Sequence, residues 1–425
     1  MNSRLSPSRE IVRAVAPLLL WALVFCAGAS PRASAQTFNV IYGFTGGADG
    51  GVPGNLALDS AGNIYGTAGH GGNFTVNNQG FESDYGTVFK LAPNGNLSVL
   101  HTFSGSDGWQ PDGLALDSGG NVYGTTYLGG QAGCGYGNGC GVVFKVTAQG
   151  QFSVLHTFVS GTDGNLPESV TADSAGNVYG VTTWGGNNGG CAYGQGCGTI
   201  FKVDTQGNLS ILYRFTGGND GDTPYANVVL DSAGNLYGAS GYDGSGGAGV
   251  VFKLSPSGVF TPLHSFNGND GYFPTNVVLD SAGNLYGIAS GGQSSAGLIY
   301  KVNLSTLAFS TVYTFSGGND GNGPGGSLVF DSAGNLYGTA SQGGNSLNNQ
   351  GCGGFGCGVL FKLTPSGQES TIYNFVGVMD GSYPYGVALD SSGRIYTGTG
   401  TGGPFLPAGP GYDAGETGTV SVTTP

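Results

Sequence analysis

One phrase, Asp-Ser-x-Gly-Asn/Arg-x-Tyr, recurs seven times along this chain of 425 residues. The copies begin at Asp59, Asp117, Asp173, Asp231, Asp280, Asp331 and Asp390. Successive copies are 49 to 59 residues apart, a spacing that suits one four-stranded unit per repeat and that is too long for short solenoid coils. The sequence therefore predicts a radial array of small β-sheets.

Each repeat is typical of four short strands. In the first copy, residues 56–58 lead into the phrase and residues 64–67 lead out of it, so its Asp and Gly are expected to form a hairpin turn. A third strand over 86–91 carries an apolar-aromatic-Lys triplet, and a fourth is expected over 97–103. The triplet recurs at 143–145, 200–202, 251–253, 299–301 and 360–362.

The two ends of the repeat array complement each other. Residues 38–44 resemble a fourth strand that lacks its first three, whereas the last repeat stops after a third strand over 417–422. Pairing these two strands would complete seven four-stranded blades and leave no open sheet edge. We therefore predict an all-β fold, a seven-bladed β-propeller over residues 36–425 whose N-terminal strand closes the last blade.

The tandem phrase G-V-V-F-K-L, F-x-G-x-D-G-x-x-P and L-D-S-A-G-N-L-Y-G-T resembles the repeat of the GloVer-type family of exported bacterial proteins. Less exact similarity extends to NHL-like and streptogramin-lyase-like β-propellers. The resemblance implies export and a propeller, but it implies no reaction. The last repeat departs from the pattern, because residues 420–422 are Val-Ser-Val where the others have the triplet.

Residues 1–35 are typical of a signal peptide, which would leave a mature chain that begins at Gln36. Arginines at 4, 9 and 13 precede an apolar run over 14–29, and 33–35 (Ala-Ser-Ala) offers a cleavage site. A membrane anchor is disfavoured because the run is short and contains a proline. A lipoprotein is disfavoured because bulky Phe25 precedes Cys26. We expect a secreted protein, periplasmic or extracellular, of bacterial origin.

Charge and composition exclude several classes of protein. Only 9% of residues are charged and the formal net charge is −13, so nucleic acid is not an expected partner. With 39% hydrophobic residues the chain is expected to fold, and its 87 Gly without a three-residue period exclude collagen. We expect a monomer without a membrane span.

Six cysteines occur as three close pairs in the predicted mature chain, at Cys134 and Cys140, Cys191 and Cys197, and Cys352 and Cys357. In an exported chain, an even number at these spacings favours three local disulfides. Zinc is the alternative. It is disfavoured because the pairs lie in different repeats without accompanying histidines.

A second aspartate recurs in the connection between repeats, within F-x-G-x-D-G-x-x-P. These ring aspartates are Asp49, Asp107, Asp163, Asp220, Asp270, Asp320 and Asp380. Their expected role is to hold a turn through side-chain hydrogen bonds to the backbone. The alternative is calcium bound by carboxylates and carbonyls, although only Asp220 has a second carboxylate nearby in sequence.

The loops between the second and third strands are long in all repeats except the fourth and fifth, which predicts a raised wall open on one side. This wall carries aromatic residues whose flat faces suit sugar rings. The ligand-binding candidates are Trp184, Tyr127, Tyr136, Tyr193 and Phe355. Packing of these rings onto the blades is the alternative.

No common catalytic motif is present, so the sequence leans away from an enzyme. His70, the one histidine in a wall loop, is the weak catalytic candidate. We expect a binding or scaffold module for extracellular polysaccharide or another cell-surface component, without a cofactor unless calcium binds. The alternative is a propeller hydrolase or lyase with its site at the channel mouth on the long-loop face.

Overall fold

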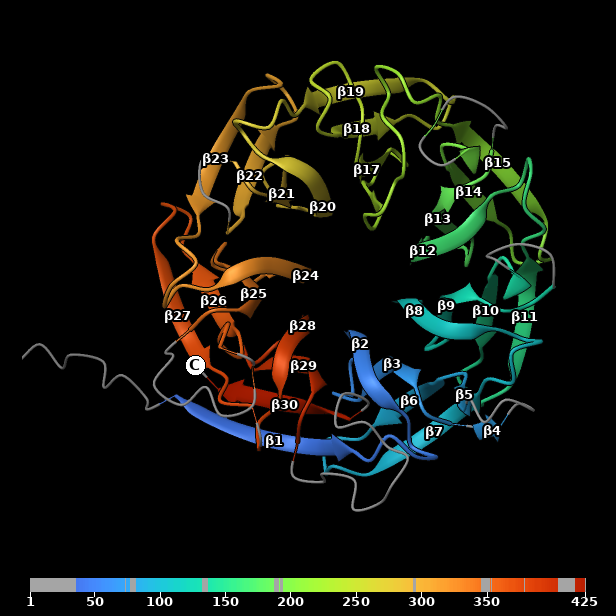
Figure 1. The fold of residues 1–425 in the computed structure, drawn as a ribbon, viewed down its shortest axis with the longest axis vertical. Helices are drawn as coiled ribbons and strands as arrows, with labels where there is room; N and C mark the ends of the chain where they lie inside the picture. The colour runs from blue at the N-terminus through green and yellow to red at the C-terminus, as the bar shows by residue number, and fades with distance from the viewer. Residues whose placement is uncertain are drawn as a thin grey trace, which may run out of the picture. The chain divides into compact units, whose positions relative to one another are not determined.

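The computed structural model places the propeller within a unit that runs from Gln36 to Pro425. It describes residues 36–72, 74–76, 82–131, 137–186, 191, 194–292, 296–344, 352, 354–377, 379–403 and 417–424. Within this unit, seven four-stranded antiparallel sheets form a ring (Figure 1). The predicted all-β, seven-bladed propeller is confirmed.

The first strand of each blade lies nearest the axis and the fourth lies at the rim (Figure 1). Blades one to three are β2 (Gly51–Leu58), β3 (Ile64–His70), β6 (Thr87–Leu91) and β7 (Leu97–Thr102); β8 (Trp109–Leu116), β9 (Val122–Leu128), β10 (Val142–Val146) and β11 (Phe152–Thr157); and β12 (Asn165–Ala172), β13 (Val178–Trp184), β14 (Thr199–Val203) and β15 (Leu209–Arg214). A two-stranded ribbon, β4 (Phe74–Val76) with β5 (Glu82–Asp84), stands in the first blade's long loop.

The remaining blades repeat the order. They are β16 (Val229–Leu230), β17 (Leu236–Ser240), β18 (Val250–Leu254) and β19 (Phe260–Ser265); β20 (Tyr272–Leu279), β21 (Asn284–Ser290), β22 (Leu298–Asn303) and β23 (Phe309–Thr314); β24 (Asn322–Phe330), β25 (Leu336–Gln342), β26 (Val359–Leu363) and β27 (Glu369–Asn374); and β28 (Ser382–Leu389), β29 (Ile395–Thr401), β30 (Gly418–Thr424) and β1 (Thr37–Phe44).

The ring closes where β1 pairs with β30. The pairing runs antiparallel from Thr37 opposite Thr424 to Phe44 opposite Gly418. β1, the first strand of the described residues, therefore supplies the outer strand of the last blade, as the sequence predicts.

The recurring phrase builds a hairpin turn through its aspartate. Asp59 Oδ1 accepts the N–H groups of Ala61 and Asn63, each at 2.9 Å. Its Oδ2 accepts Asn63 Nδ2 at 2.7 Å and the Tyr65 hydroxyl at 3.3 Å. The side chain thus satisfies donors that the turn would otherwise leave unpaired, so the phrase has a structural explanation.

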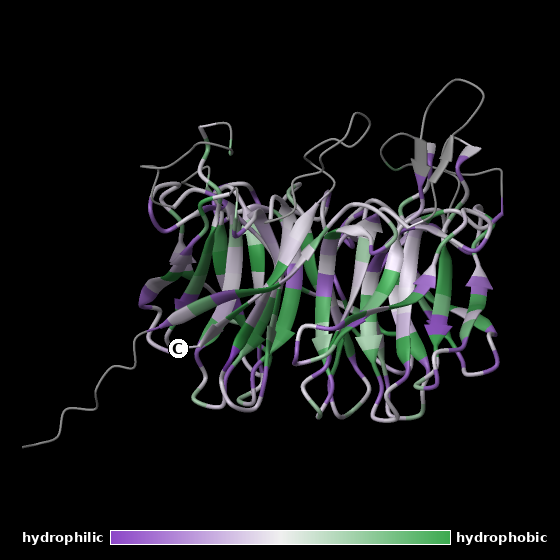
Figure 2. Ribbon diagram, turned by 90° about the horizontal axis from the view of Figure 1, so that it is seen from below, coloured by the Kyte–Doolittle hydropathy of each residue, from purple (hydrophilic) through white to green (hydrophobic). Residues whose placement is uncertain are grey.

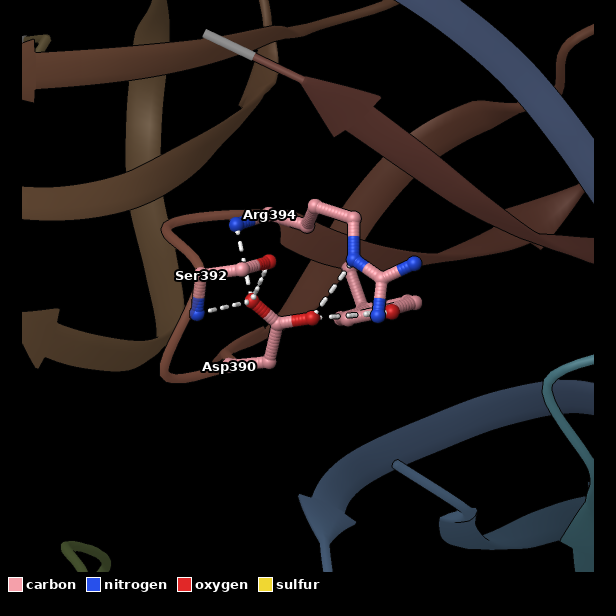
Figure 3. A network of polar contacts seen from close by, with 4 residues as sticks. Asp390, Ser392 and Arg394 are labelled. Carbon is pink, nitrogen blue, oxygen red and sulfur yellow. Dashed lines mark hydrogen bonds and ion pairs between the residues drawn. The ribbon is translucent and has the colours of Figure 1, made fainter. Parts of the chain in front are cut away.

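A cation stands over the tyrosine of each phrase. In blades one to six it is the lysine of the third-strand triplet, with Nζ 5.1 to 5.9 Å from the ring centroid. In blade seven Val422 lies opposite Tyr396, and Arg394 takes over, with its guanidinium carbon 5.8 Å from the Tyr396 centroid. Arg394 Nε also donates to Asp390 Oδ2 at 2.7 Å (Figure 3), so one residue replaces both the asparagine and the lysine.

An aromatic ring lies on a glycine in the middle of blades one to six. In blade three the ring of Phe201 covers Gly180, where an added Cβ would lie 2.6 Å from Phe201 Cζ. Blade seven has lost both partners, because Ser421 replaces the aromatic residue and Thr397 replaces the glycine opposite it. The two changes fit together, since a smaller third-strand side chain leaves room for a larger one on the second strand.

The core lies between blades. Among the described residues, each of seven buried clusters draws side chains from two neighbouring blades. A phenylalanine at the end of one blade meets the aromatic triplet residue of the next edge-on, as Phe103 meets Phe144 at 5.3 Å. Hydrophobic residues accordingly occupy the middle of the blades, away from the turns (Figure 2).

Gly180→Ala should destabilise the protein by roughly 1–3 kcal/mol, because the new methyl group would overlap the Phe201 ring in a packed core. The control is Gly218→Ala, where an added Cβ meets only Thr216 Oγ1, at 3.7 Å; it should change stability by less than about 0.5 kcal/mol. Urea unfolding of both variants measures the difference. Equal effects at the two positions would contradict the packing argument.

Deleting residues 36–45 should lower the melting temperature and promote association, because it removes buried Phe44 and exposes the edge of β30. Differential scanning calorimetry and light scattering measure both effects. A synthetic peptide of residues 36–45 should restore the melting temperature. A truncated protein that keeps its melting temperature and stays monomeric would show that β1 does not close the ring.

Candidate functional site

The mouth of the channel is framed by a backbone clamp between neighbouring blades. Thr223, which precedes Pro224, has φ 51°, and its N–H donates to the carbonyl of Cys197 in the preceding blade at 3.1 Å. Pro224 packs on Gly198, whose φ is 93° and where an added Cβ would lie 2.5 Å from Pro224 Cδ. A left-handed conformation is costly for threonine. The hydrogen bond to Cys197 and the packing of Pro224 on Gly198 hold Thr223 in this conformation.

The clamp recurs at every blade junction. The donors are the N–H groups of Val52, Gln110, Leu166, Thr223, Phe273, Gly323 and Tyr383, and the acceptors are the carbonyls of Thr417, Tyr85, Cys140, Cys197, Ala248, Ala296 and Cys357. All seven donor residues have φ between 50° and 65°. Three acceptors are disulfide-bonded cysteines, which places the crosslinks beside the clamp.

The residue after each clamp proline is where the repeats differ in chemistry. This row consists of Gly54, Asp112, Glu168, Tyr225, Thr275, Gly325 and Tyr385. Strand pairing is irregular just beyond the proline, for example between Pro111 and Leu114 and between Pro167 and Val170. Such irregularities re-aim side chains, and all seven residues of the row line cavities along the channel.

A cavity of about 520 Å³ occupies the channel mouth. Its lining includes His70, Asp112, Tyr127, Glu168, Tyr225 and Tyr385. A second cavity of about 270 Å³ shares Asp112, Glu168, Tyr225 and Tyr385 with it. The four shared side chains therefore stand where the two spaces meet.

Two carboxyl groups give this cavity its charge. Glu168 is 3% exposed, and its Oε1 accepts the Thr183 hydroxyl at 2.6 Å. Burial, and then the nearby charge of Asp112, raise the pKa of Glu168 well above its ordinary value. Burial also raises the pKa of Asp112. The pair therefore resists carrying two negative charges at once.

The tyrosines around these carboxyl groups stay protonated at neutral pH. Burial, followed by the charges of Glu168 and Asp112, raises the pKa of Tyr127 to about 12. The charge of Glu168, followed by burial, raises the pKa of Tyr225, and burial chiefly raises that of Tyr385. Tyr225 and Tyr385 are 43% and 40% exposed, so their rings remain available to a ligand.

His70 lies at the end of β3 and also lines the larger cavity. Its Nδ1 is 3.0 Å from Asp84 Oδ2, and that oxygen accepts the Gly71 N–H at 2.9 Å. Burial raises the pKa of Asp84, but the hydrogen bonds from His70 and Gly71 outweigh it, and the net change in this pKa is downward. Asp84 therefore stays ionised and orients the imidazole.

Among the described candidates for catalysis and ligand binding, the structure brings His70 and Tyr127 to this cavity. Trp184 ends β13 opposite Asn165 and does not line either channel-mouth cavity, and Phe355 is 67% exposed. Tyr136 and Tyr193 lie outside the described residues. Sequence reasoning missed Asp112, Glu168, Tyr225 and Tyr385, although their variation inside a repeated phrase was a usable signal.

The ring aspartates hold the turns between blades. Asp220 accepts the Tyr213 hydroxyl at 2.9 Å, the Thr216 N–H at 2.9 Å and the Thr216 hydroxyl at 2.7 Å. In another turn His101 takes the tyrosine position, with Nε2 2.9 Å from Asp107. These carboxylates face donors. Across the described part of the chain, no group of three or more His, Cys, Asp or Glu side chains is placed to hold a metal ion.

Two of the expected disulfides are present, Cys191–Cys197 and Cys352–Cys357, with Cα atoms 5.2 and 5.3 Å apart. Cys140 is also disulfide-bonded, while its expected partner Cys134 lies outside the described residues. In the portion of the chain that the structure describes, no helix is long and apolar enough to span a membrane.

Glu168→Gln should stabilise the protein at pH 8. Because the folded pKa of Glu168 is raised, the wild-type free energy of unfolding should fall as pH rises from about 4.3 through the folded pKa, by about 1.4 kcal/mol for each pH unit that separates the unfolded and folded pKa values. Glutamine cannot ionise and still accepts from Thr183, so this decline should shrink. Chemical unfolding between pH 4 and pH 8 measures it.

Asp390→Asn is the control of opposite sign. Burial raises the pKa of Asp390, but hydrogen bonds from Ser392 and Arg394 outweigh this and lower it to about 2. Its ionised form therefore stabilises the fold at neutral pH, and the asparagine variant should be less stable there. If Glu168→Gln is also less stable at pH 8, with an unchanged pH dependence, the account of the carboxyl pair is wrong.

Comparisons with known proteins identify the repeat. No curated protein sequence matches the chain. Similar solved structures include a gluconolactonase from Xanthomonas campestris (12% identity, TM-score 0.45, covering 91% of this chain and 89% of that one) and a luciferin-regenerating enzyme (13%, 0.45, 92% and 95%). The profile of the Gloeobacter/Verrucomicrobia repeat matches residues 30–191 and 135–352, and the chain belongs to this repeat family.

Proposed function

We propose that this protein is an exported binding module that holds a carbohydrate of extracellular polysaccharide or of a cell surface at the channel mouth. The observation that carries the proposal is the cavity of about 520 Å³ in which tyrosine faces stand beside two carboxyl groups. Export is supported by the signal-peptide pattern of residues 1–35 and by the disulfides, which persist in oxidising compartments.

The lining suits the two kinds of surface on a sugar. A sugar ring presents C–H groups on its faces, which pack on aromatic rings such as those of Tyr225 and Tyr385. Its hydroxyl groups can donate to the carboxyl oxygens of Asp112 and Glu168. The volume lies within the usual range of small-ligand pockets, about 300–1,000 Å³.

Glycines create the space on the side of blades one and seven. Gly54, Gly69 and Gly400 line the cavity together with the bulky tyrosines. An added Cβ at Gly69 would have only the Val52 carbonyl oxygen within reach, at 4.0 Å. The glycines there thus leave an opening large enough for a ligand. Packing of the core does not require glycine at Gly69, because an added Cβ would contact little.

A propeller hydrolase or lyase is the second candidate, favoured by the contact between His70 and Asp84. An imidazole oriented by a carboxylate is a common proton-transfer device, and His70 shares the cavity with Asp112 and Glu168. Turnover of a lactone or of a uronate-containing glycan that disappears in His70→Ala would favour this alternative.

A glycan array distinguishes the channel mouth from the long-loop wall. We expect Tyr225→Ala and Tyr385→Ala to weaken binding about five- to thirtyfold, because each loses a stacking face worth roughly 1–2 kcal/mol. The matched control is Phe355→Ala, an exposed aromatic residue outside the cavity lining, and it should bind normally. Loss of binding in Phe355→Ala or Trp184→Ala, with Tyr225→Ala unaffected, would place the site on the wall instead.

A further inference from the structure

We propose that the channel-mouth cavity is selective for a ligand that carries a positively charged ammonium group, such as a sugar with a free amine. The proposal deepens the proposed function and rests on the same cavity. It depends on three features of the lining: two carboxyl groups, several tyrosine faces, and no lysine or arginine among the described residues that line the two cavities.

The carboxyl groups lack a counter-charge. Asp112 and Glu168 come from neighbouring blades, and each is close enough to the other to disfavour ionisation of the pair. Elsewhere in the chain, a carboxylate can be balanced by a cationic partner, as Asp390 is by Arg394 at 2.7 Å. A cation that enters the cavity would relieve the repulsion between the two groups. An anionic sugar would increase it.

The tyrosines favour an organic cation over a metal ion. The faces of aromatic rings attract ammonium groups, and Tyr127, Tyr225 and Tyr385 surround the same carboxyl pair. Six lysines already stand over tyrosine rings in this protein at 5.1 to 5.9 Å. A calcium ion would instead need six to eight oxygen ligands, and rings do not supply them.

The size of the cavity points the same way. Glu168 Oε1 accepts a hydrogen bond from the Thr183 hydroxyl, so Glu168 does not depend on Asp112 for a hydrogen-bond partner. The cavity beside the two carboxyl groups has a volume of about 520 Å³. That space accommodates an ammonium group together with the ring that bears it. A bare ion would leave most of it unfilled.

The charge on the ligand can be isolated with two probes of nearly the same shape. Choline carries a quaternary ammonium, and 3,3-dimethylbutan-1-ol replaces its nitrogen by carbon. Isothermal titration at pH 8 should show choline binding at least about tenfold more tightly. At pH 7, where its amine is largely protonated, glucosamine should likewise bind more tightly than N-acetylglucosamine. Equal affinities within both pairs would overturn the proposal.

Variants of Asp112 and Glu168 test whether these carboxyl groups cause the preference for choline over its neutral analogue. Glu168→Gln and Asp112→Asn should each bring the choline preference down by about tenfold, whereas Asp204→Asn removes the same charge from an exposed turn and should leave it intact. Wild-type affinity for choline should rise as pH rises, because the carboxyl groups ionise. The other titratable side chains among the described residues that line this cavity are His70, Tyr127, Tyr225, Tyr383 and Tyr385. A preference that survives both amide variants would overturn the assignment.

The outcome separates this inference from the proposed function. Binding of neutral oligosaccharides without any preference for amines would leave the carbohydrate module standing and would refute the ammonium selectivity. Binding of choline and amines, without binding to any glycan on the array, would support the ammonium selectivity and would refute the carbohydrate assignment. Loss of a folded state in a variant is detected by its melting temperature, and the second amide variant then supplies the test.

Discussion

The ring depends on the clamp between neighbouring blades, in which a left-handed residue donates to the preceding blade and the following proline packs on that blade's glycine. Thr223 N–H to Cys197 carbonyl, with Pro224 on Gly198, is one of seven such junctions. A non-glycine residue at φ near 50° is tolerated only where its surroundings determine it. The closed ring supplies that determination, and each junction in turn helps to fix the orientation of its blade.

The core obeys a second constraint, that rings and glycines must match. Phe201 lies on Gly180 in blade three, whereas blade seven has Ser421 opposite Thr397. The same blade replaces a lysine and an asparagine with Arg394 alone. Blade seven, which two distant segments complete, departs from the repeat, and its substitutions compensate in pairs, as dense packing and buried hydrogen bonds require.

The site occupies the positions that these constraints leave free. The clamp determines the backbone conformation around each proline, but none of its contacts involves the side chain of the residue that follows the proline. That row runs from Gly54 through Asp112 and Glu168 to Tyr385. Burial raises the pKa values of both carboxyl groups, and the charge of Asp112 raises that of Glu168 further, which costs stability at neutral pH. This is the pattern expected where function rather than folding selects the residues.

The sequence by itself determined the blade number, the turns, the closing strand and two disulfides, because each follows from residues adjacent in the chain or from repetition. Asp59 and Asn63, for instance, form their turn within five residues. Only the tertiary structure decided that Asp112, Glu168, Tyr225 and Tyr385 share one cavity. They come from four blades, and the irregular pairing beyond each proline breaks the two-residue alternation from which the direction of a side chain could be read.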